Sequence, residues 1–427
     1  MGYLDLSKQE LEKEYGNLVK RFEEIKGMGL NLNMARGKPG KEQLDLSLPM
    51  LDTINSKSDF IGEDKMDCRN YGLLNGITEC RKLFADILGV DAENVIVGGS
   101  SSLNMMFDTI SCFMTAPAVE GCKPWYEVKN RKFLCPVPGY DRHFGVTEFF
   151  GVEMVNVPMT SEGPDMDMVE RLVSSDDSIK GIWCVPKYSN PQGITYSDET
   201  VRRMAALKPA AEDFRIYWDN AYVIHDLYEE KKDTLLDIIS ECEKAGNPDM
   251  VYEFCSTSKV SFPGSGIAAI VTSKANLDFI EKQFTMQTIG HDKINQLRHV
   301  RYFKNIDGIN AHMMKQAAIM RPKFEMVERT LQDEIGGLGI GSWISPKGGY
   351  FICFHTLPGC AKSVVAKAKE AGVVMTPAGA PFPYGKDPED SVIRIAPSFP
   401  TMEELETATK IFVLCVKLAS VEKLLAE

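Results

Sequence analysis

Between residues 70 and 300 of this 427-residue chain, short apolar runs alternate with windows of helical periodicity. The runs are rich in Val and Ile, and most are apolar at successive positions, which is typical of strands covered on both faces. Because these strands alternate with helices, the pattern predicts an α/β fold around a mainly parallel sheet. The runs lie at 94–97, 133–135, 181–185, 214–218, 251–255 and 266–271.

Both ends of the chain carry predicted helices whose first residues form capping boxes. Ser7 and Glu10 begin an amphipathic helix over 7–26, and Thr401 and Glu404 begin the last helix. In a capping box, two side chains satisfy two backbone N–H groups that the helix itself leaves unpaired. The sequence therefore places the start of each helix within a residue or two.

From about residue 310 the alternation of strands and helices stops. A Met-rich helical stretch over 312–334 precedes short strands near 350–354 and 391–395. This pattern predicts a smaller α+β domain, against which the N-terminal helix packs. We therefore expect a large domain over 56–308 and a small domain made of 1–55 and 309–427.

The charge balance and the apolar runs exclude several classes of function. Acidic residues outnumber basic ones, 60 to 48, which gives a net charge of −12. Nucleic-acid binding depends on Lys and Arg side chains that neutralise phosphates, so we expect no nucleic-acid partner. The first residues carry no secretory signal and no apolar run is long enough to cross a bilayer, so we expect no membrane partner.

The cysteines and histidines are scattered along the chain. The 11 Cys lie between Cys68 and Cys415, without a C-x-x-C pair, and their number is odd. Both facts argue against a disulfide framework and indicate free thiols in a reducing cytoplasm. The 6 His show no H-E-x-x-H or similar spacing, so we expect no metal site.

Reactive side chains follow two of the predicted strands. Lys259 comes after the run at 251–255, and it is either a solvated loop charge or a Schiff-base amine held near a carbonyl cofactor. Asp219 ends the run at 214–218, where it is either a turn residue or the partner of a cationic ring nitrogen. Tyr222 could reach the same pocket. The carboxyl ends of parallel strands share one edge of the sheet, so we expect these groups to converge there.

Three further residues, two after strands and one inside a strand, are candidates for the same site. Asn190 precedes a proline and is either part of a turn or an amide donor to a phenolate oxygen. Tyr140 is either a packing residue or an aromatic that stacks on a planar ring, with His143 three residues later. Arg394 is a charge inside a short strand, where a buried guanidinium needs an anion such as a substrate carboxylate.

The turn from Gly98 to Ser102 joins the run at 94–97 to a predicted helix. Small residues there provide either an ordinary serine cap or, through exposed N–H groups, hydroxyls and the helix dipole, a phosphate site. Pyridoxal phosphate needs all of the groups above: a lysine, an acid for its ring nitrogen, donors to its ring oxygen, a stacking aromatic and a phosphate cup. The joint pattern therefore predicts this cofactor.

The chain resembles the fold-type I pyridoxal-phosphate aminotransferases of class I over nearly its whole length. The resemblance implies a mainly parallel, seven-stranded sheet in the large domain. It rests on five residues in the family's order and at its spacing: Asn190, Asp219, Tyr222, Lys259 and Arg394. The strings ARGKP, EQLDLS, KYSNP and STSK with FPGSG are most similar to the bacterial type Ic aspartate aminotransferases.

The resemblance also implies a role for each residue. Asn190 and Tyr222 bond the ring oxygen, Asp219 pairs with the ring nitrogen, Lys259 carries the cofactor and the proton, and Arg394 binds the substrate α-carboxylate. Tyr140 stacks on the ring, His143 lies behind the aspartate, and Gly37 belongs to a substrate loop. The phosphate cup is made of Gly99, Ser100, Ser101, Ser102, Ser256 and Ser258.

The same resemblance implies a homodimer with shared active sites, because Tyr71 matches a tyrosine that reaches the phosphate of the neighbouring subunit.

Two features of the sequence depart from the family. The usual phosphate-binding Arg after the lysine is missing, since Ser265, Gly266 and Ile267 stand in that region. The usual N-P-T-G turn reads N-P-Q-G here, with Gln192 in third place.

The implied reaction is ping-pong transamination of L-aspartate and 2-oxoglutarate through an aldimine of Lys259. Such substrates carry a second carboxylate, for which the candidate cations are Arg36, Lys38, Arg298 and Arg301; we favour Arg36 because its loop matches the substrate-covering segment. The open alternatives are an aromatic or 2-aminoadipate transaminase, a β-lyase or a decarboxylase with the same cofactor. A serine acyl-enzyme and a regulator with an aminotransferase-like domain are remote.

Overall fold

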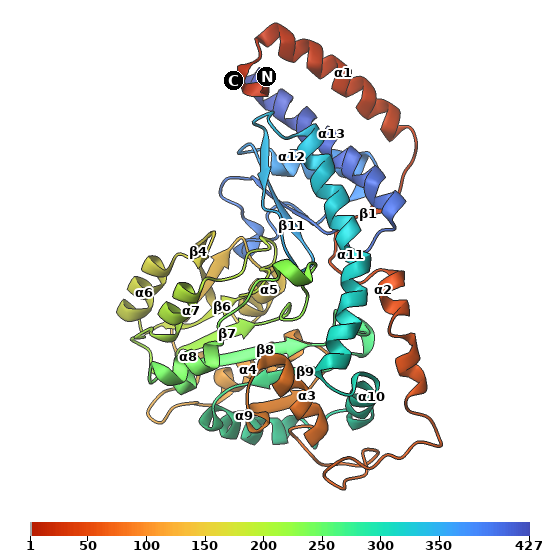
Figure 1. The fold of residues 1–427 in the computed structure, drawn as a ribbon. Coiled ribbons are helices and arrows are strands. Elements are labelled where there is room, and N and C mark those ends of the chain that lie inside the picture. The colour runs from red at the N-terminus through yellow and green to blue at the C-terminus, as the bar shows by residue number, and fades with distance from the viewer. Residues whose placement is uncertain (1) are drawn as a thin grey trace.

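The computed structural model describes residues 2–427, and its centre is one large sheet with helices on both faces (Figure 1). Four of its seven neighbouring strand pairs are parallel, while β9 runs antiparallel to both of its neighbours. In sheet order the strands are β2 (Val95–Gly98), β9 (Ala268–Val271), β8 (Val251–Ser256), β7 (Arg215–Asp219), β6 (Ile179–Cys184), β3 (Lys132–Val137), β4 (Glu153–Thr160) and β5 (Gly163–Pro164).

All six predicted apolar runs are strands of this sheet, so the mainly parallel α/β architecture is confirmed. The sheet has eight strands where seven were expected, because the two-residue β5 pairs antiparallel with β4 and extends the edge. The sequence pattern missed β4. This strand pairs with β5 only at Met159 and Thr160, so most of its outer side is unpaired and tolerates polar residues and a proline, Pro158, which interrupt an apolar run.

The central strands bury both faces, which explains their continuous apolar sequences. In β7, Ile216 and Trp218 pack into the hydrophobic cluster on one face, and Tyr217 packs into the cluster on the other. The first face is covered by α3 (Thr78–Leu88), α6 (Met166–Ser175), α7 (Asp198–Ala205), α8 (Ile238–Lys244) and α10 (Lys293–Phe303). The second face is covered by α4 (Ser102–Thr115), α5 (Asp141–Phe149) and α9 (Lys274–Gln287).

The remaining strands form two smaller sheets, which pack with a second group of helices. The first sheet has the order β10 (Gly341–Trp343), β11 (Ile352–Thr356), β13 (Val392–Ile395), and the second pairs β1 (Leu32–Asn33) with β12 (Val373–Val374). The helices are α1 (Lys8–Lys26), α2 (Lys41–Asp45), α11 (Ile306–Glu334), α12 (Ala361–Glu370) and α13 (Met402–Ala426). The predicted strands near 350–354 and 391–395 are therefore confirmed as β11 and β13.

Both predicted capping boxes are present, at Ser7 with Glu10 and at Thr401 with Glu404. Helix α1 packs along α13, and β1 pairs with β12, so the N-terminal segment belongs with the C-terminal part. Helix α11 runs from the large sheet into this part (Figure 1). None of the helices in 2–427 combines the length and apolar character that crossing a membrane requires.

We propose that the domains follow the sheets. All strands of the large sheet lie inside 56–308, and all strands of the two smaller sheets lie in 1–55 or 309–427. Most of one hydrophobic cluster joins α1, α11, α12 and α13 around β11 and β13, and it also takes in Val185, Tyr188, Tyr222 and Leu227 from 56–308. A boundary near residue 308 falls within the first turn of α11, so this helix would connect the two domains.

Candidate active site

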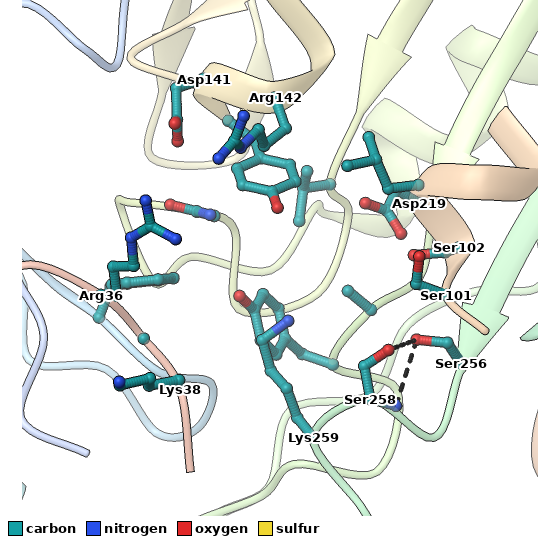
Figure 2. A pocket seen from close by; sticks show the side chains of 18 of the residues that line it. Arg36, Lys38, Ser101, Ser102, Asp141, Arg142, Asp219, Ser256, Ser258 and Lys259 are labelled. Atoms are coloured by element: carbon teal, nitrogen blue, oxygen red, sulfur yellow. Dashed lines mark hydrogen bonds between the residues drawn. The ribbon is translucent and has the colours of Figure 1, made fainter. Parts of the chain in front are cut away.

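A cavity of about 290 Å³ lies at the carboxyl ends of the parallel strands, between the two domains proposed above. In the view of Figure 2, Asp219 and the serines lie on one side of Lys259, while Arg36, Lys38 and Asp141 lie on the other. The cavity is lined by Arg36, Gly37, Lys38, Ser101, Ser102, Leu103, Tyr140, Asp141, Arg142, Val185, Asn190, Asp219, Ala221, Tyr222, Ser256, Ser258, Lys259, Phe351 and Arg394.

Lys259 stands in the turn after β8 and extends into the cavity (Figure 2). Its Nζ lies 5.0 Å from the ring centre of Tyr222 and 5.9 Å from that of Tyr350. Burial lowers the pKa of Lys259, the charge of Asp219 raises it, and the charge of Arg394 lowers it. An amine with a lowered pKa is a better nucleophile and a better proton acceptor near neutral pH.

Asp219 is the last residue of β7 and is held from behind by His143. The Nε2 atom of His143 lies 3.0 Å from Oδ2 of Asp219, and the imidazole stacks on Trp183 with ring centres 4.3 Å apart. The other carboxylate oxygen, Oδ1 of Asp219, is buried and has no hydrogen-bond partner among residues 2–427. A buried, unpaired carboxylate oxygen is costly, so this atom is suited to a protonated ring nitrogen.

Tyr140 and Tyr222 are the aromatic side chains of the cavity wall. Tyr140 caps α5, and its ring meets that of His143 edge-on at 4.9 Å. Burial, with the charge of Asp219, raises the pKa of Tyr140 to about 12, so it stays a neutral phenol. Burial likewise raises the pKa of Tyr222 well above its usual value, which keeps its hydroxyl proton available for donation.

Arg394 lies on β13 and brings a cation to the cavity from the small sheet. It is buried, and its Nη1 donates to Oδ1 of Asn190 at 3.1 Å and to Oδ1 of Asp141 at 3.0 Å. Its guanidinium carbon lies 4.8 Å from the ring centre of Phe351. The guanidinium is therefore held in place on several sides, which suits it to bind a planar carboxylate.

The serine end of the cavity is built at the N-terminus of α4. Ser101 caps this helix and accepts from the N–H of Asn104, and Ser256 Oγ donates to Ser258 Oγ at 3.1 Å. Hydroxyls together with the free N–H groups and dipole of a helix start form an anion site. Gly99 and Ser100 stand in the same turn but outside the lining: Gly99 N–H donates to Nδ1 of His291, and Ser100 Oγ donates to Oδ1 of Asn104.

The candidate cations separate into two groups. Arg36 and Lys38 line the cavity, and Lys38 Nζ lies 3.8 Å from the ring centre of Phe399. Arg298 and Arg301 do not line it, because Arg298 donates to Ser265 Oγ and Arg301 donates to the carbonyl of Asp59. The structure thus leaves two of the four sequence candidates beside Lys259.

The structure also places residues in the cavity that the sequence did not single out. Asp141, Arg142 and Phe351 all line it. Asp141 and Arg142 directly follow Tyr140, so their position next to a strand-end aromatic was an available signal. Phe351 was not recognisable, because it reaches the cavity from the small domain. Its ring lies so close to Gly37 that a Cβ there would be 2.4 Å from it, which explains the glycine.

Tyr71 does not line the cavity of its own chain, and this residue is 76% exposed.

The side chains that line the cavity fit pyridoxal phosphate well. The protonated ring nitrogen of the cofactor suits Oδ1 of Asp219, which has no partner among residues 2–427. The amine of Lys259 suits its aldehyde, and the anion site at the serine end suits its phosphate. With the doubly covered parallel sheet, this site defines a pyridoxal-phosphate-dependent aminotransferase of fold type I.

Comparisons with known proteins agree with this class. Residues 6–427 match the family described as aspartate amino-transferase. An aspartate aminotransferase of Corynebacterium glutamicum is 43% identical over 418 residues, which cover 98% of this chain and 96% of that protein. The chain belongs to the aspartate aminotransferase family.

Solved structures show the same relationship. An aspartate transaminase from Corynebacterium glutamicum superimposes with a TM-score of 0.96 at 42% identity, covering 99% of each chain. An α-aminoadipate aminotransferase from Thermus thermophilus, complexed with N-(5'-phosphopyridoxyl)-L-leucine, has a TM-score of 0.74 over 99% of this chain and 97% of its own. Its identity is 19%, so it shows a shared fold alone.

Proposed function

We propose that this protein is an aspartate aminotransferase, which converts L-aspartate and 2-oxoglutarate to oxaloacetate and L-glutamate by a ping-pong mechanism. The observation that carries the proposal is the pair of cations, buried Arg394 and exposed Arg36, in the cavity that holds Lys259. A substrate with a carboxylate at each end needs a cation at each end. The 43% identical relative named aspartate aminotransferase supports the same substrate.

Lys259 would carry the cofactor and the proton. When bound, pyridoxal phosphate supplies an aldehyde that condenses with amines and a ring that accepts electrons from the substrate Cα. The Nζ of Lys259 would take the proton from the substrate Cα and return it elsewhere. Burial lowers the pKa of Lys259, which increases the neutral fraction able to accept that proton.

Four residues would hold the cofactor ring. Asp219 offers Oδ1 to the ring nitrogen, and His143 orients the carboxylate through Oδ2. Asn190 gives its carbonyl oxygen to Arg394, so its amide N–H groups are left as donors to the ring oxygen, together with the hydroxyl of Tyr222. Tyr140 lines the wall of the cavity with its ring and would stack on the cofactor.

The phosphate would bind at the serine end of the cavity. Ser101, Ser102, Ser256 and Ser258 line this end, and the start of α4 adds its N–H groups and dipole. Gly99 and Ser100 would contribute through the shape of the turn, since their own polar groups already bond His291 and Asn104. Hydroxyls and helix N–H groups would thus replace the missing family Arg.

Arg36 is our candidate for the second carboxylate of the substrate. It stands on the loop that contains Gly37, and the ring of Phe351 packs against that glycine. Lys38 on the same loop is less available, because its Nζ is engaged by the ring of Phe399 at 3.8 Å. Arg142 lines the cavity too and would add positive charge near the same end.

We also propose a homodimer with shared active sites. Tyr71 is exposed and lies outside its own cavity, which suits a side chain that completes a neighbour's site. The residue after Tyr71 is held by a hydrogen bond, since Nζ of Lys293 donates to the carbonyl of Gly72 at 3.0 Å. Met286 and Ile289, on the segment just before Lys293, are 86% and 64% exposed, and exposed apolar side chains of this kind suit an interface.

The cysteines support a cytoplasmic location. All 11 are free thiols, and ten of them are buried. Free cysteines persist in a reducing compartment, whereas the cysteines of secreted proteins are commonly oxidised to disulfides.

The function is tested by an absorbance spectrum of the purified protein before and after addition of L-aspartate alone. We expect the cofactor band to shift with L-aspartate and to return with 2-oxoglutarate, because the two half-reactions are separate. A cofactor band that ignores L-aspartate but responds to another amino acid would overturn the substrate assignment. Analysis of the products would then distinguish a different transaminase from a lyase.

A further inference from the structure

The substrate-binding arginine already holds a carboxylate that belongs to the protein. Nη1 of Arg394 donates to Oδ1 of Asp141 at 3.0 Å. The arginine side chain is 7% exposed and that of Asp141 is 35% exposed, so the aspartate lies on the solvent side of the pair. Asp141 is in the first turn of α5, directly after Tyr140.

The pair uses only part of the guanidinium. Nη1 makes both strong contacts, to Asp141 and to Asn190, while Nη2 has one long contact of 3.4 Å to Oγ1 of Thr376. Nε of Arg394 is buried without a partner. A substrate carboxylate can take two parallel bonds from an arginine, so it binds this group better than an aspartate that takes one.

From this geometry we propose that Asp141 is a built-in substitute for the substrate α-carboxylate. It neutralises Arg394 while no substrate is bound, and the incoming α-carboxylate displaces it. The proposal rests on the role assigned to Arg394 under the proposed function. Asp141 is thus a positioning residue that sets the affinity for carboxylates through Arg394, by competing for it.

The ion pair between Asp141 and Arg394 has two physical consequences. A buried guanidinium without an anion is costly, so the free protein is more stable when Asp141 pairs with it. The same pair lowers the apparent affinity of every carboxylate ligand, because a ligand binds only the fraction of molecules in which Arg394 is released. Once displaced, the carboxylate of Asp141 stays near Arg36 and Arg142, which line the same cavity and offset its charge.

The test uses Asp141→Asn, which keeps the size of the side chain and removes its charge. The matched control is Asp198→Asn, since Asp198 is also in the first turn of a helix and pairs with Arg202 at 3.2 Å, away from the cavity. Binding of propionate and of succinate to each holoenzyme is measured by calorimetry. Neither ligand carries an amine, so no turnover occurs.

We expect Asp141→Asn to bind both ligands about five- to tenfold more tightly, as the loss of a competing ion pair of moderate strength implies. Its melting temperature without ligand should fall, because Arg394 has lost its anion. The control should bind both ligands as the unmodified enzyme does. A purely structural role for Asp141 would lower stability and weaken binding together.

Two results would overturn the proposal. Unchanged or weaker binding of propionate to Asp141→Asn would show that Asp141 does not compete for Arg394. A gain confined to succinate would place its effect on the second carboxylate, through Arg36 or Arg142. Failure of the proposed transamination would be seen separately, as a cofactor spectrum that ignores L-aspartate, and would leave these affinities measurable.

Discussion

His143 and Asp219 form a directional pair in which one oxygen of the carboxylate is used and the other is free. Nε2 of His143 lies 3.0 Å from Oδ2, while Oδ1 is buried without a partner. The imidazole is buried and stacked on Trp183 at an interplanar angle of 9°, which restrains its orientation. The free oxygen is therefore held in one orientation, toward the cavity in which the ring nitrogen of the cofactor would lie.

His143→Phe should keep the stack on Trp183 and leave Oδ2 of Asp219 without its partner. We expect turnover to fall about 10- to 100-fold, the cost of losing one hydrogen bond to a buried charge. Steady-state rates of the holoenzyme measure this loss. His143→Gln, which retains a donor, serves as the control. Unchanged turnover in His143→Phe would argue for packing alone.

Lys259→Ala should retain the cofactor without a covalent bond and lose nearly all turnover. The variant removes both the amine that attaches the cofactor and the proton carrier, so we expect a loss of about a thousandfold or more. Cofactor content after denaturation and steady-state rates measure the two effects. Lys274→Ala, at an exposed lysine on α9, is the control. Near-normal turnover of Lys259→Ala would refute the assignment.

Arg36→Ala should raise KM for L-aspartate while attachment of the cofactor to Lys259 stays normal. Loss of one charge-assisted contact predicts a rise of about 10- to 100-fold. The KM for L-alanine, which lacks the second carboxylate, should change little. Arg301→Ala is the control, since this side chain bonds the Asp59 carbonyl outside the cavity. Unchanged aspartate kinetics would exclude Arg36 and direct attention to Arg142.

Tyr71→Ala and Lys259→Ala should complement each other if the sites are shared. Each variant alone should be nearly inactive at limiting cofactor. In a mixed dimer, one site would combine Lys259 of one chain with Tyr71 of the other, so a random mixture should recover about a quarter of the activity. Activity after unfolding and refolding the mixture together measures this. No recovery, with mixed dimers present, would place Tyr71 in the site of its own chain.

Glu253 predicts how stability depends on pH. It lies in the middle of β8, where burial raises its pKa to about 8, against a hydrogen bond from Asn220 that lowers it. The folded protein therefore holds a proton that the unfolded chain releases near pH 4.5, so this contribution to stability falls as pH rises from about 4.5 to 8. Glu253→Gln should raise the melting temperature more at pH 8.5 than at pH 5. An equal change at both values would contradict this.

Much of the site could be predicted because it follows strands. Asp219 ends β7, and Asn190 and Lys259 lie in the turns after β6 and β8, so a parallel sheet must bring them to one edge. Arg394 was recognisable as a charge within a short apolar strand. The serines were recognisable because a helix start after a strand is a local feature of the sequence.

Other features could not be read from local pattern. The edge strand β4 lacks the apolar signature of the buried strands, and Phe351 reaches the cavity only through packing of the small sheet against the large one. The candidate cations show the same limit. Arg36 and Arg298 look alike in the sequence, yet the first lines the cavity and the second is bound to Ser265.

The fold class and the kind of chemistry follow from the amino-acid sequence, because alternating buried strands allow few topologies and because one cofactor requires that set of groups after those strands. Which charged side chains meet depends instead on the packing of the whole chain. The pairing of Arg394 with Asp141 joins residues 253 positions apart, one on β13 and the other in the first turn of α5. Such a contact depends on how the two parts of the molecule pack, and no local sequence pattern encodes that packing.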